Sequence, residues 1–155
     1  MYCVYEKDTY KAKKRNGRVV LVTYEKKEGF SNYIDVLGNE HSDIFMKEVE
    51  IEDVEVIYKE VVTLCYLGIY FELFIPITSV SVEDNKYVLF TSSEEIAQKF
   101  DFEKKEQFVF AKEICKEQID SIKITRKPIK EFEKQGIKEI IISKNEIETW
   151  LNSIK

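Results

Sequence analysis

The dipeptide Asn16-Gly17 is the feature of this sequence that most constrains its fold. Asn followed by Gly suits the positive φ angles of a type I′ turn, the two-residue turn that joins antiparallel strands. Strand-like segments flank it, roughly 9–15 before the turn and 18–27 after it. A further apolar segment, 30–37, follows after a short polar return. The sequence therefore predicts an N-terminal antiparallel meander.

The segment 45–58 predicts another strand, because apolar and acidic residues alternate along part of it with a period of two. This alternation slips by one residue at Asp53, where we expect a bulge or a turn. Shorter apolar segments at 87–91, 108–111, 122–125 and 140–142 add further strands.

A nearly charge-free segment, 61–82, is about as long as a membrane-spanning helix. Its residues argue against that interpretation, since Glu72 lies at its centre and Pro76 interrupts it. A charged side chain at such a position costs about 2.5–3.5 kcal/mol on the insertion scale. Val, Ile, Thr, Tyr and Phe dominate the segment and favour strands. We expect two consecutive buried strands bent near Gly68, and no stable membrane insertion.

Helical signals are confined to the second half of the chain. Ser92 lies three residues before Glu95, which is the spacing of a capping box. A weaker signal predicts a short helix between Pro128 and Gly136. The clearest signal is terminal, where a second capping-box match precedes an apolar stripe at helical spacing. The residues of this stripe are Ile147, Trp150, Leu151 and Ile154.

These patterns predict an α+β fold that is predominantly antiparallel β. The N-terminal meander would form a sheet, a sandwich or a partly open barrel, and two or three short helices would lie in the C-terminal half, including a C-terminal amphipathic helix. With 155 residues and no linker-like or repeated segment, we expect a single domain over 1–155. Three widely spaced cysteines and the absence of a leader-like N-terminus indicate a cytoplasmic protein.

Catalytic signatures are missing from the sequence. It has no phosphate-binding glycine loop and no metalloprotease, hydrolase or kinase motif. His41 is the single histidine, and Glu40 and Asp43 could orient it as a general base, but a solvated loop histidine is the simpler interpretation. Cys115 has Lys112 and Lys116 nearby, without a partner that would complete a mechanism. We therefore predict no cofactor, no metal and no catalytic residue.

Charge is distributed unevenly along the chain. Residues 1–27 hold eight Lys or Arg against three acids, whereas 45–60 holds six acids against two lysines. The net charge of -5 argues against nucleic acid as a partner. A solvated face, or pairing with the N-terminal lysines, would explain the acidic residues. The sharper hypothesis makes them a docking surface for a basic protein. Its predicted residues are Glu48, Glu50, Glu52, Asp53 and Glu55.

These observations lead to the hypothesis of a non-enzymatic protein-binding module, such as a small acidic bacterial inhibitor or immunity-type protein that neutralises a toxin or enzyme. The alternative is a small-molecule-binding or enzymatic β-barrel with an aromatic-lined pocket. A third hypothesis places the basic N-terminal hairpin on anionic lipid. Open strand edges would also allow a homodimer.

Overall fold

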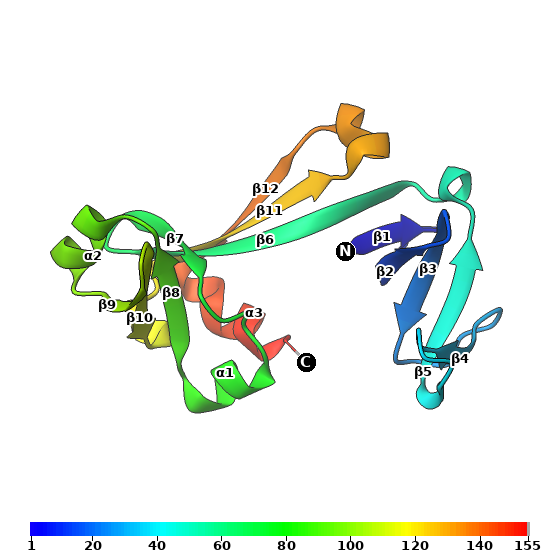
Figure 1. Cartoon of the computed structure of the whole chain (residues 1–155), viewed down its shortest axis with the longest axis horizontal. Helices are drawn as coiled ribbons and strands as arrows, with labels where there is room; N and C mark the ends of the chain where they lie inside the picture. Colours follow the sequence, from blue (N-terminus) through cyan, green and yellow to red (C-terminus); the bar gives the residue numbers. More distant parts are fainter. Residues whose placement is uncertain (155) are drawn as a thin grey trace. The chain divides into compact units, whose positions relative to one another are not determined.

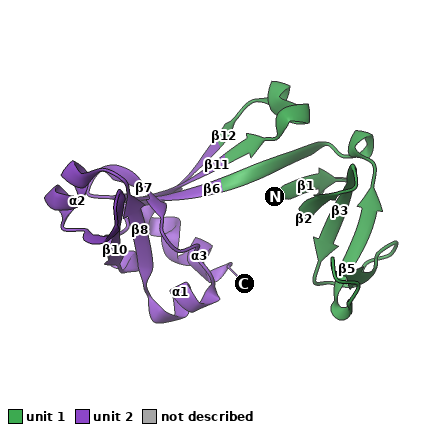
Figure 2. Ribbon diagram, in the orientation of Figure 1, with its two compact units in different colours: residues 1–60, 126–138 green, residues 61–125, 139–155 purple. Residues whose placement is uncertain are grey.

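The structure is a computed structural model that describes residues 1–154. It confirms the predicted fold class, since 50% of the residues lie in strands, the pairing is antiparallel and the helices are short. The strands do not close into a barrel. The chain forms two compact units, unit 1 with residues 1–60 and 126–138 and unit 2 with 61–125 and 139–155 (Figure 2).

Unit 1 is built on antiparallel strands in the order β4-β5-β3-β2-β1-β6 (Figure 1). Strand β6 begins in this unit and continues into unit 2. The elements are β1 (Tyr2–Tyr5), β2 (Asp8–Arg15), β3 (Arg18–Thr23), β4 (Ser31–Ile34), β5 (Glu40–Val49), the 3₁₀ helix η1 (Ile51–Asp53), β6 (Val56–Tyr66) and the 3₁₀ helix η3 (Lys130–Gln135).

Two tight turns set the register of the first three strands. Asn16 and Gly17 both have positive φ, 53° and 76°, so the predicted β2–β3 hairpin is confirmed. An equivalent hairpin joins β1 to β2 through Glu6 and Lys7, with φ of 47° and 71°. The sequence did not predict this second turn, because Glu and Lys seldom adopt positive φ.

The third predicted arm of the meander pairs differently from the expectation. Strand β4 pairs with β5 and not with β3, and β3 pairs with β5. The reason is the length of the polar connection 24–30, which does not return the chain tightly. A short turn at 35–39 instead makes β4 and β5 the hairpin, and β4 becomes the edge strand.

The acidic segment contains the predicted interruption. Strand β5 ends at Val49, η1 occupies Ile51–Asp53, and β6 begins at Val56. The turn near Asp53 is therefore confirmed, and its form is a 3₁₀ helix. Val54 follows η1 and is buried in the core of unit 1, which anchors the turn to the sheet. That core is small and contains Cys3, Tyr10, Ala12, Val19, Leu21, Val49, Val54 and Ile57.

Unit 2 contains the strands β6, β7, β8, β10 and β9 in that order, and β11 pairs with β12 and β6. The elements are β7 (Ile69–Leu73), α1 (Ser79–Asp84), β8 (Tyr87–Thr91), α2 (Glu94–Phe100), β9 (Glu103–Glu106), β10 (Val109–Ile114), η2 (Lys116–Gln118), β11 (Ser121–Pro128), β12 (Lys138–Ser143), η4 (Lys144–Glu146) and α3 (Ile147–Asn152). Strand β11 continues into unit 1, and β12 begins there.

The charge-free segment folds as predicted into two strands. Strands β6 and β7 form a hairpin that turns at Leu67 and Gly68, whose φ angles are 50° and 86°. Within residues 1–154, no helix is long and apolar enough to cross a membrane.

The helices of unit 2 confirm some predictions and correct others. The N-cap of α2 is Ser93, which accepts the Ile96 amide, so the predicted start at Ser92 is wrong by one residue. Helix α1 was not predicted, because its six residues present no full apolar stripe. The C-terminal stripe is confirmed, since Ile147 and Leu151 of α3 are buried. Strand β12 is less buried than expected, because Ile141 is 51% exposed.

The core of unit 2 is larger and more aromatic than that of unit 1. Phe71 lies at its centre, with ring centroids 5.1 Å from Phe102 and 6.1 Å from Phe100. Leu64, Leu89 and several isoleucines surround these rings. Such a core supports the strands and leaves functional variation to exposed turns and side chains.

Candidate functional site

The five predicted acidic residues lie along the β5–η1–β6 connection, and all five are exposed. We call them the acidic turn. Glu48 is in β5, Glu50 precedes η1, Glu52 and Asp53 are within η1, and Glu55 follows it. They do not form the straight row that one continuous strand would give, because η1 bends the chain between them.

Arg18 from β3 joins two of these carboxylates. Its Nη1 lies 3.2 Å from Glu48 Oε2, and its Nε lies 3.0 Å from Glu50 Oε1. The register brings Arg18 close, because Val20, two residues further along β3, is opposite Glu48. One guanidinium therefore relieves the repulsion between the two glutamates.

The remaining acids of the turn have no ion-pair partner within the described part of the chain. The Glu55 side chain accepts the Lys7 amide at 3.3 Å, and the Glu55 backbone carbonyl accepts Gln135 Nε2 at 2.9 Å. Glu52 and Asp53 are exposed at the tip of η1. The tip is thus anchored on both sides while these two carboxylates face solvent.

The basic N-terminal residues divide into two groups. Lys14 pairs with Glu131, and Lys27 pairs with Asp8. Among residues 1–154, no carboxylate lies within 4.0 Å of the charged nitrogens of Lys11, Lys13 and Arg15, which alternate along β2. Arg18 is therefore the N-terminal cation that pairs with the acidic turn, and the lysines do not.

A cleft of about 370 Å³ lies beside two of these unpaired lysines. We call it the tyrosine cleft. It is lined by Tyr2, Lys11, Lys13, Val22, Tyr24 and Tyr33, with further apolar atoms from neighbouring strands of unit 1. Three tyrosines line it, as expected for the predicted aromatic-lined pocket, although the strands around it do not close into a barrel.

His41 has a structural partner. Its Nε2 lies 3.0 Å from Asp35 Oδ2, and Asp35 Oδ1 accepts the amides of Leu37 and Asn39, each at 2.9 Å. The hydrogen bond from His41, followed by that from the Asn39 amide, lowers the pKa of Asp35 to about 2. These bonds fix the β4–β5 turn, whose tip exposes Val36 and Leu37.

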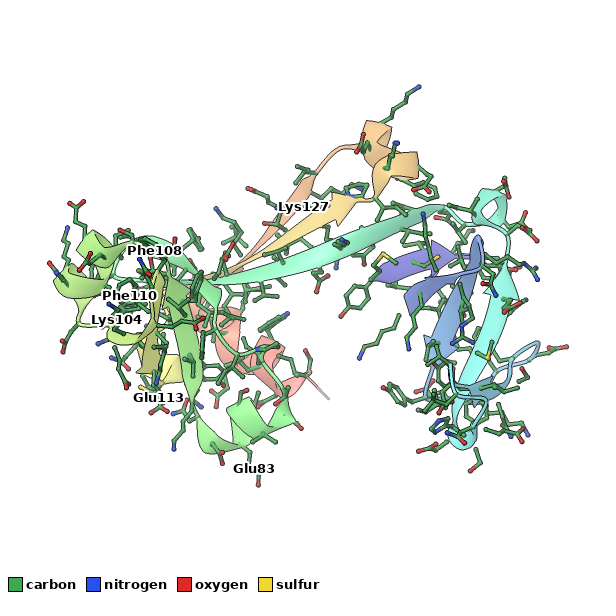
Figure 3. The ribbon with its side chains drawn as sticks, in the orientation of Figure 1. Glu83, Lys104, Phe108, Phe110, Glu113 and Lys127 are labelled. Atoms are coloured by element: carbon green, nitrogen blue, oxygen red, sulfur yellow. The ribbon has the colours of Figure 1, made fainter. Side chains whose placement is uncertain are left out.

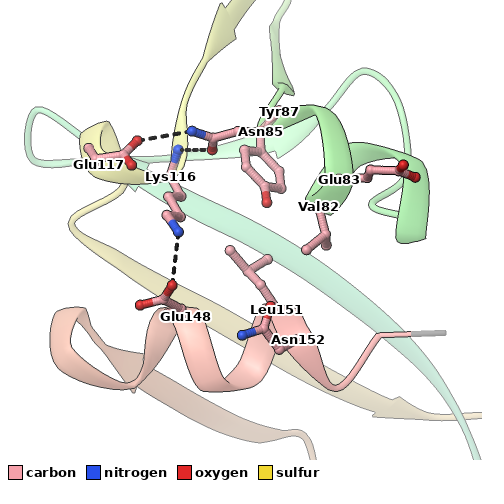
Figure 4. A pocket seen from close by; sticks show the side chains of 9 residues that line it. All are labelled: Val82, Glu83, Asn85, Tyr87, Lys116, Glu117, Glu148, Leu151 and Asn152. Carbon is pink, nitrogen blue, oxygen red and sulfur yellow. Dashed lines mark hydrogen bonds and ion pairs between the residues drawn. The ribbon is translucent and has the colours of Figure 1, made fainter.

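Unit 2 has a polar pocket of about 250 Å³ between α1, the β10–η2 connection and α3 (Figure 4). Lys116 Nζ donates to Glu148 Oε1 at 3.0 Å, and Asn85 Nδ2 donates to Glu117 Oε2 at 3.2 Å. Asn85 Oδ1 accepts the Lys116 amide at 2.8 Å. Burial raises the pKa of Tyr87, which keeps its phenol neutral. The dashed lines in Figure 4 mark these contacts, which tie α3 to η2 and η2 to the end of α1, while Glu83 lines the pocket outside this network.

The cysteines offer no redox pair. Cys3 and Cys65 are buried, and Cys115 is half-buried, with its Sγ 3.4 Å from Gln118 Oε1. Within residues 1–154, no three His, Cys, Asp or Glu side chains are grouped to hold a metal ion.

Two phenylalanines of β10 and the turn before it differ sharply (Figure 3). Phe110 is buried in the unit 2 core, whereas Phe108 is 66% exposed and has a φ of 62°. Positive φ is strained for a bulky side chain. No pocket described above includes Phe108.

Fold and surface together define a mostly antiparallel β protein with two compact units and short helices. A family model described as "Uncharacterised conserved protein UCP033725" matches residues 1–132. Since this match covers most of the chain, the protein belongs to that family. Neither a curated protein nor a solved structure shows significant similarity to it.

Proposed function

We propose that this protein is a non-enzymatic protein-binding module of the inhibitor or immunity type, which neutralises a basic toxin or enzyme through the acidic turn. The observation that carries the proposal is the anchored, charged tip of η1. Val54 fixes the turn in the core, while Glu52 and Asp53 face solvent without a cation. Five carboxylates against the single guanidinium of Arg18 leave a local excess of negative charge.

The physical basis is electrostatic complementarity. A patch of one sign steers a partner of opposite charge into contact and raises the association rate. An anchored turn also pays little ordering cost on binding, because its backbone is fixed beforehand. The free thiols support a reducing, cytoplasmic location.

The test uses the full chain carrying Glu52→Lys and Asp53→Lys. Wild-type and variant chains serve as bait in an extract of the native cells, and a retained protein is purified for calorimetry. We expect a basic partner whose Kd rises at least about tenfold with the variant, a change of roughly 1.4 kcal/mol. Added salt should weaken wild-type binding.

A matched control is Glu83→Lys with Asp84→Lys, an adjacent exposed acidic pair in α1 of unit 2. This control changes the net charge equally and should leave the Kd within about twofold of wild type. The proposal fails if the partner binds the η1 variant as tightly as the control. It also fails if every protein that the wild-type chain retains is retained equally by the η1 variant, or if the wild-type chain retains none.

A further inference from the structure

The tyrosine cleft combines unpaired cations with aromatic and apolar walls. Lys11 and Lys13 lie on the same face of β2, two residues apart, which is about 7 Å along a strand. Both line the cleft. Strand alternation alone explains why two lysines share a face, but it does not explain why neither has a carboxylate partner.

Tyrosines hold these lysines in place of acids. Lys13 Nζ donates to the Tyr33 hydroxyl at 2.9 Å and lies 5.1 Å from the centre of its ring. Lys11 Nζ lies 5.8 Å from the centre of the Tyr24 ring. A cation over an aromatic face is attracted to the ring but keeps its full charge. The ammonium groups are thus positioned without being neutralised.

The pKa of the Tyr33 phenol reflects the positive charge around it. The hydrogen bond from Lys13 lowers the pKa of the Tyr33 phenol against the opposing effect of burial, and Arg15 adds to the lowering. Arg15 Nη2 lies 3.4 Å from the same hydroxyl, and Arg15 Nη1 donates to the Ile34 carbonyl at 3.1 Å. Two cations, Lys13 and Arg15, therefore lie beside one phenol, and an anion entering the cleft would meet a favourable field.

The rest of the cleft is apolar. Val22 of β3 and Ile44 of β5 line it together with Ala12 of β2. Tyr24, which is 65% exposed, forms a wall that a flat ring could contact. The cleft volume of about 370 Å³ lies within the range of small-molecule sites.

We propose that the tyrosine cleft binds a small organic anion, with its oxyanion group between the ammonium groups of Lys11 and Lys13 and its apolar or aromatic body against Tyr24 and Val22. A phosphate ester and a carboxylate share this chemistry. The site uses no residue of the acidic turn, so it is independent of the protein-binding proposal, and either can fail without the other.

The test titrates the full chain with phenyl phosphate and with phenylacetate, using isothermal calorimetry and amide chemical shifts. We expect saturable 1:1 binding in the millimolar range or tighter, with shifts at Lys11, Lys13 and Tyr24. Binding of one probe alone identifies the preferred oxyanion, and binding of both supports the shared chemistry. Phenol and inorganic phosphate should each bind at least about tenfold more weakly, since each lacks one half of the recognition.

Variants then assign the contacts. Lys11→Gln with Lys13→Gln should raise the Kd at least about tenfold, and Tyr24→Ala should raise it about threefold. The matched control, Lys7→Gln with Lys26→Gln, removes the same charge from exposed lysines of unit 1 outside the cleft and should change the Kd less than twofold. Circular dichroism checks that each variant is folded.

Three results would overturn the proposal. The first is that neither probe gives saturable binding up to about 10 mM. The second is that binding survives in the folded Lys11/Lys13 variant. The third is that the wild-type shifts map outside the cleft, a result that does not depend on how well any variant folds.

Discussion

Two hollows of the molecule, the polar pocket of unit 2 and the tyrosine cleft of unit 1, hold similar side chains in opposite ways. In the polar pocket of unit 2, the Lys116 side chain donates to Glu148, and the Asn85 side chain donates to Glu117. In the tyrosine cleft of unit 1, Lys11 lies over the Tyr24 ring and Lys13 donates to the Tyr33 hydroxyl. Within the described chain, neither ammonium group has a carboxylate within 4.0 Å. A pocket whose charges are paired internally contributes to architecture. A cleft whose charges are held but not paired is available to a ligand.

The hydrophobic cores of the two units also differ, in size and in the side chains that they bury. Unit 2 buries a cluster of phenylalanines and isoleucines around Phe71, whereas unit 1 buries fewer and smaller side chains. The unit with the smaller core is also the one that carries both the acidic turn and the tyrosine cleft. The larger core and the two proposed binding surfaces therefore belong to different units, and three kinds of measurement test this difference.

The largest effect should come from matched core truncations. Leu21 of unit 1 and Leu89 of unit 2 are both fully buried. Leu21→Ala and Leu89→Ala should each cost about 2–5 kcal/mol of unfolding free energy, from lost burial and the cavity left behind. Urea unfolding measures the loss, and hydrogen exchange locates it.

The exchange pattern decides whether the chain is one cooperative domain, as its sequence predicts. In that case either truncation should speed exchange of the slowest amides in both units equally. Faster exchange confined to unit 1 in Leu21→Ala, and to unit 2 in Leu89→Ala, would contradict a single domain.

A smaller effect should follow from the buried thiol of unit 1. Burial raises the pKa of Cys3 from 9.0 to about 11, so folding favours the neutral thiol. Its contribution to stability is therefore complete below the unfolded pKa and is lost as the pH rises from 9 towards 11. The urea concentration at the unfolding midpoint should decrease as the pH is raised from about 8 to about 10.5. The decrease should be smaller in Cys3→Ala than in the wild-type protein. An equal fall in both proteins would show that Cys3 is not the group responsible.

The smallest effect compares two lysines. Lys116→Gln breaks the pair with Glu148 and should lower the urea midpoint slightly, by far less than Leu89→Ala, because exposed ion pairs contribute little. Lys11→Gln removes a cation without a carboxylate partner and should leave the midpoint unchanged or raise it. A larger loss for Lys11→Gln than for Lys116→Gln would refute the contrast between the two hollows.

Local patterns in the sequence predicted much of this fold. Asn16-Gly17 identified its hairpin because both residues tolerate positive φ, and the stripe of Ile147 and Leu151 identified the terminal helix. The Glu6-Lys7 turn was missed, because nothing in those residue types favours the backbone that tertiary pairing imposes on them. Helix α1 was missed for a related reason, since its six residues are too few for a clear period.

The sites were harder to predict than the strands. The sequence located the acidic turn, because its residues are nearly contiguous. It did not place Arg18 beside Glu48, thirty residues away, nor Lys13 against Tyr33, twenty residues away. Both contacts depend on the pairing of β3 with β5 and on the edge position of β4, which no local pattern specifies.

The course of the backbone through the two units has a consequence for how this protein can be divided or rearranged. The chain passes from one unit to the other three times, at residues 60–61, 125–126 and 138–139. No single cut therefore yields two intact pieces, and neither unit corresponds to one uninterrupted stretch of coding sequence. A gene fusion or truncation that carries away one unit as a cassette must also sever the other. Only a circularly permuted or relinked chain could present either unit alone.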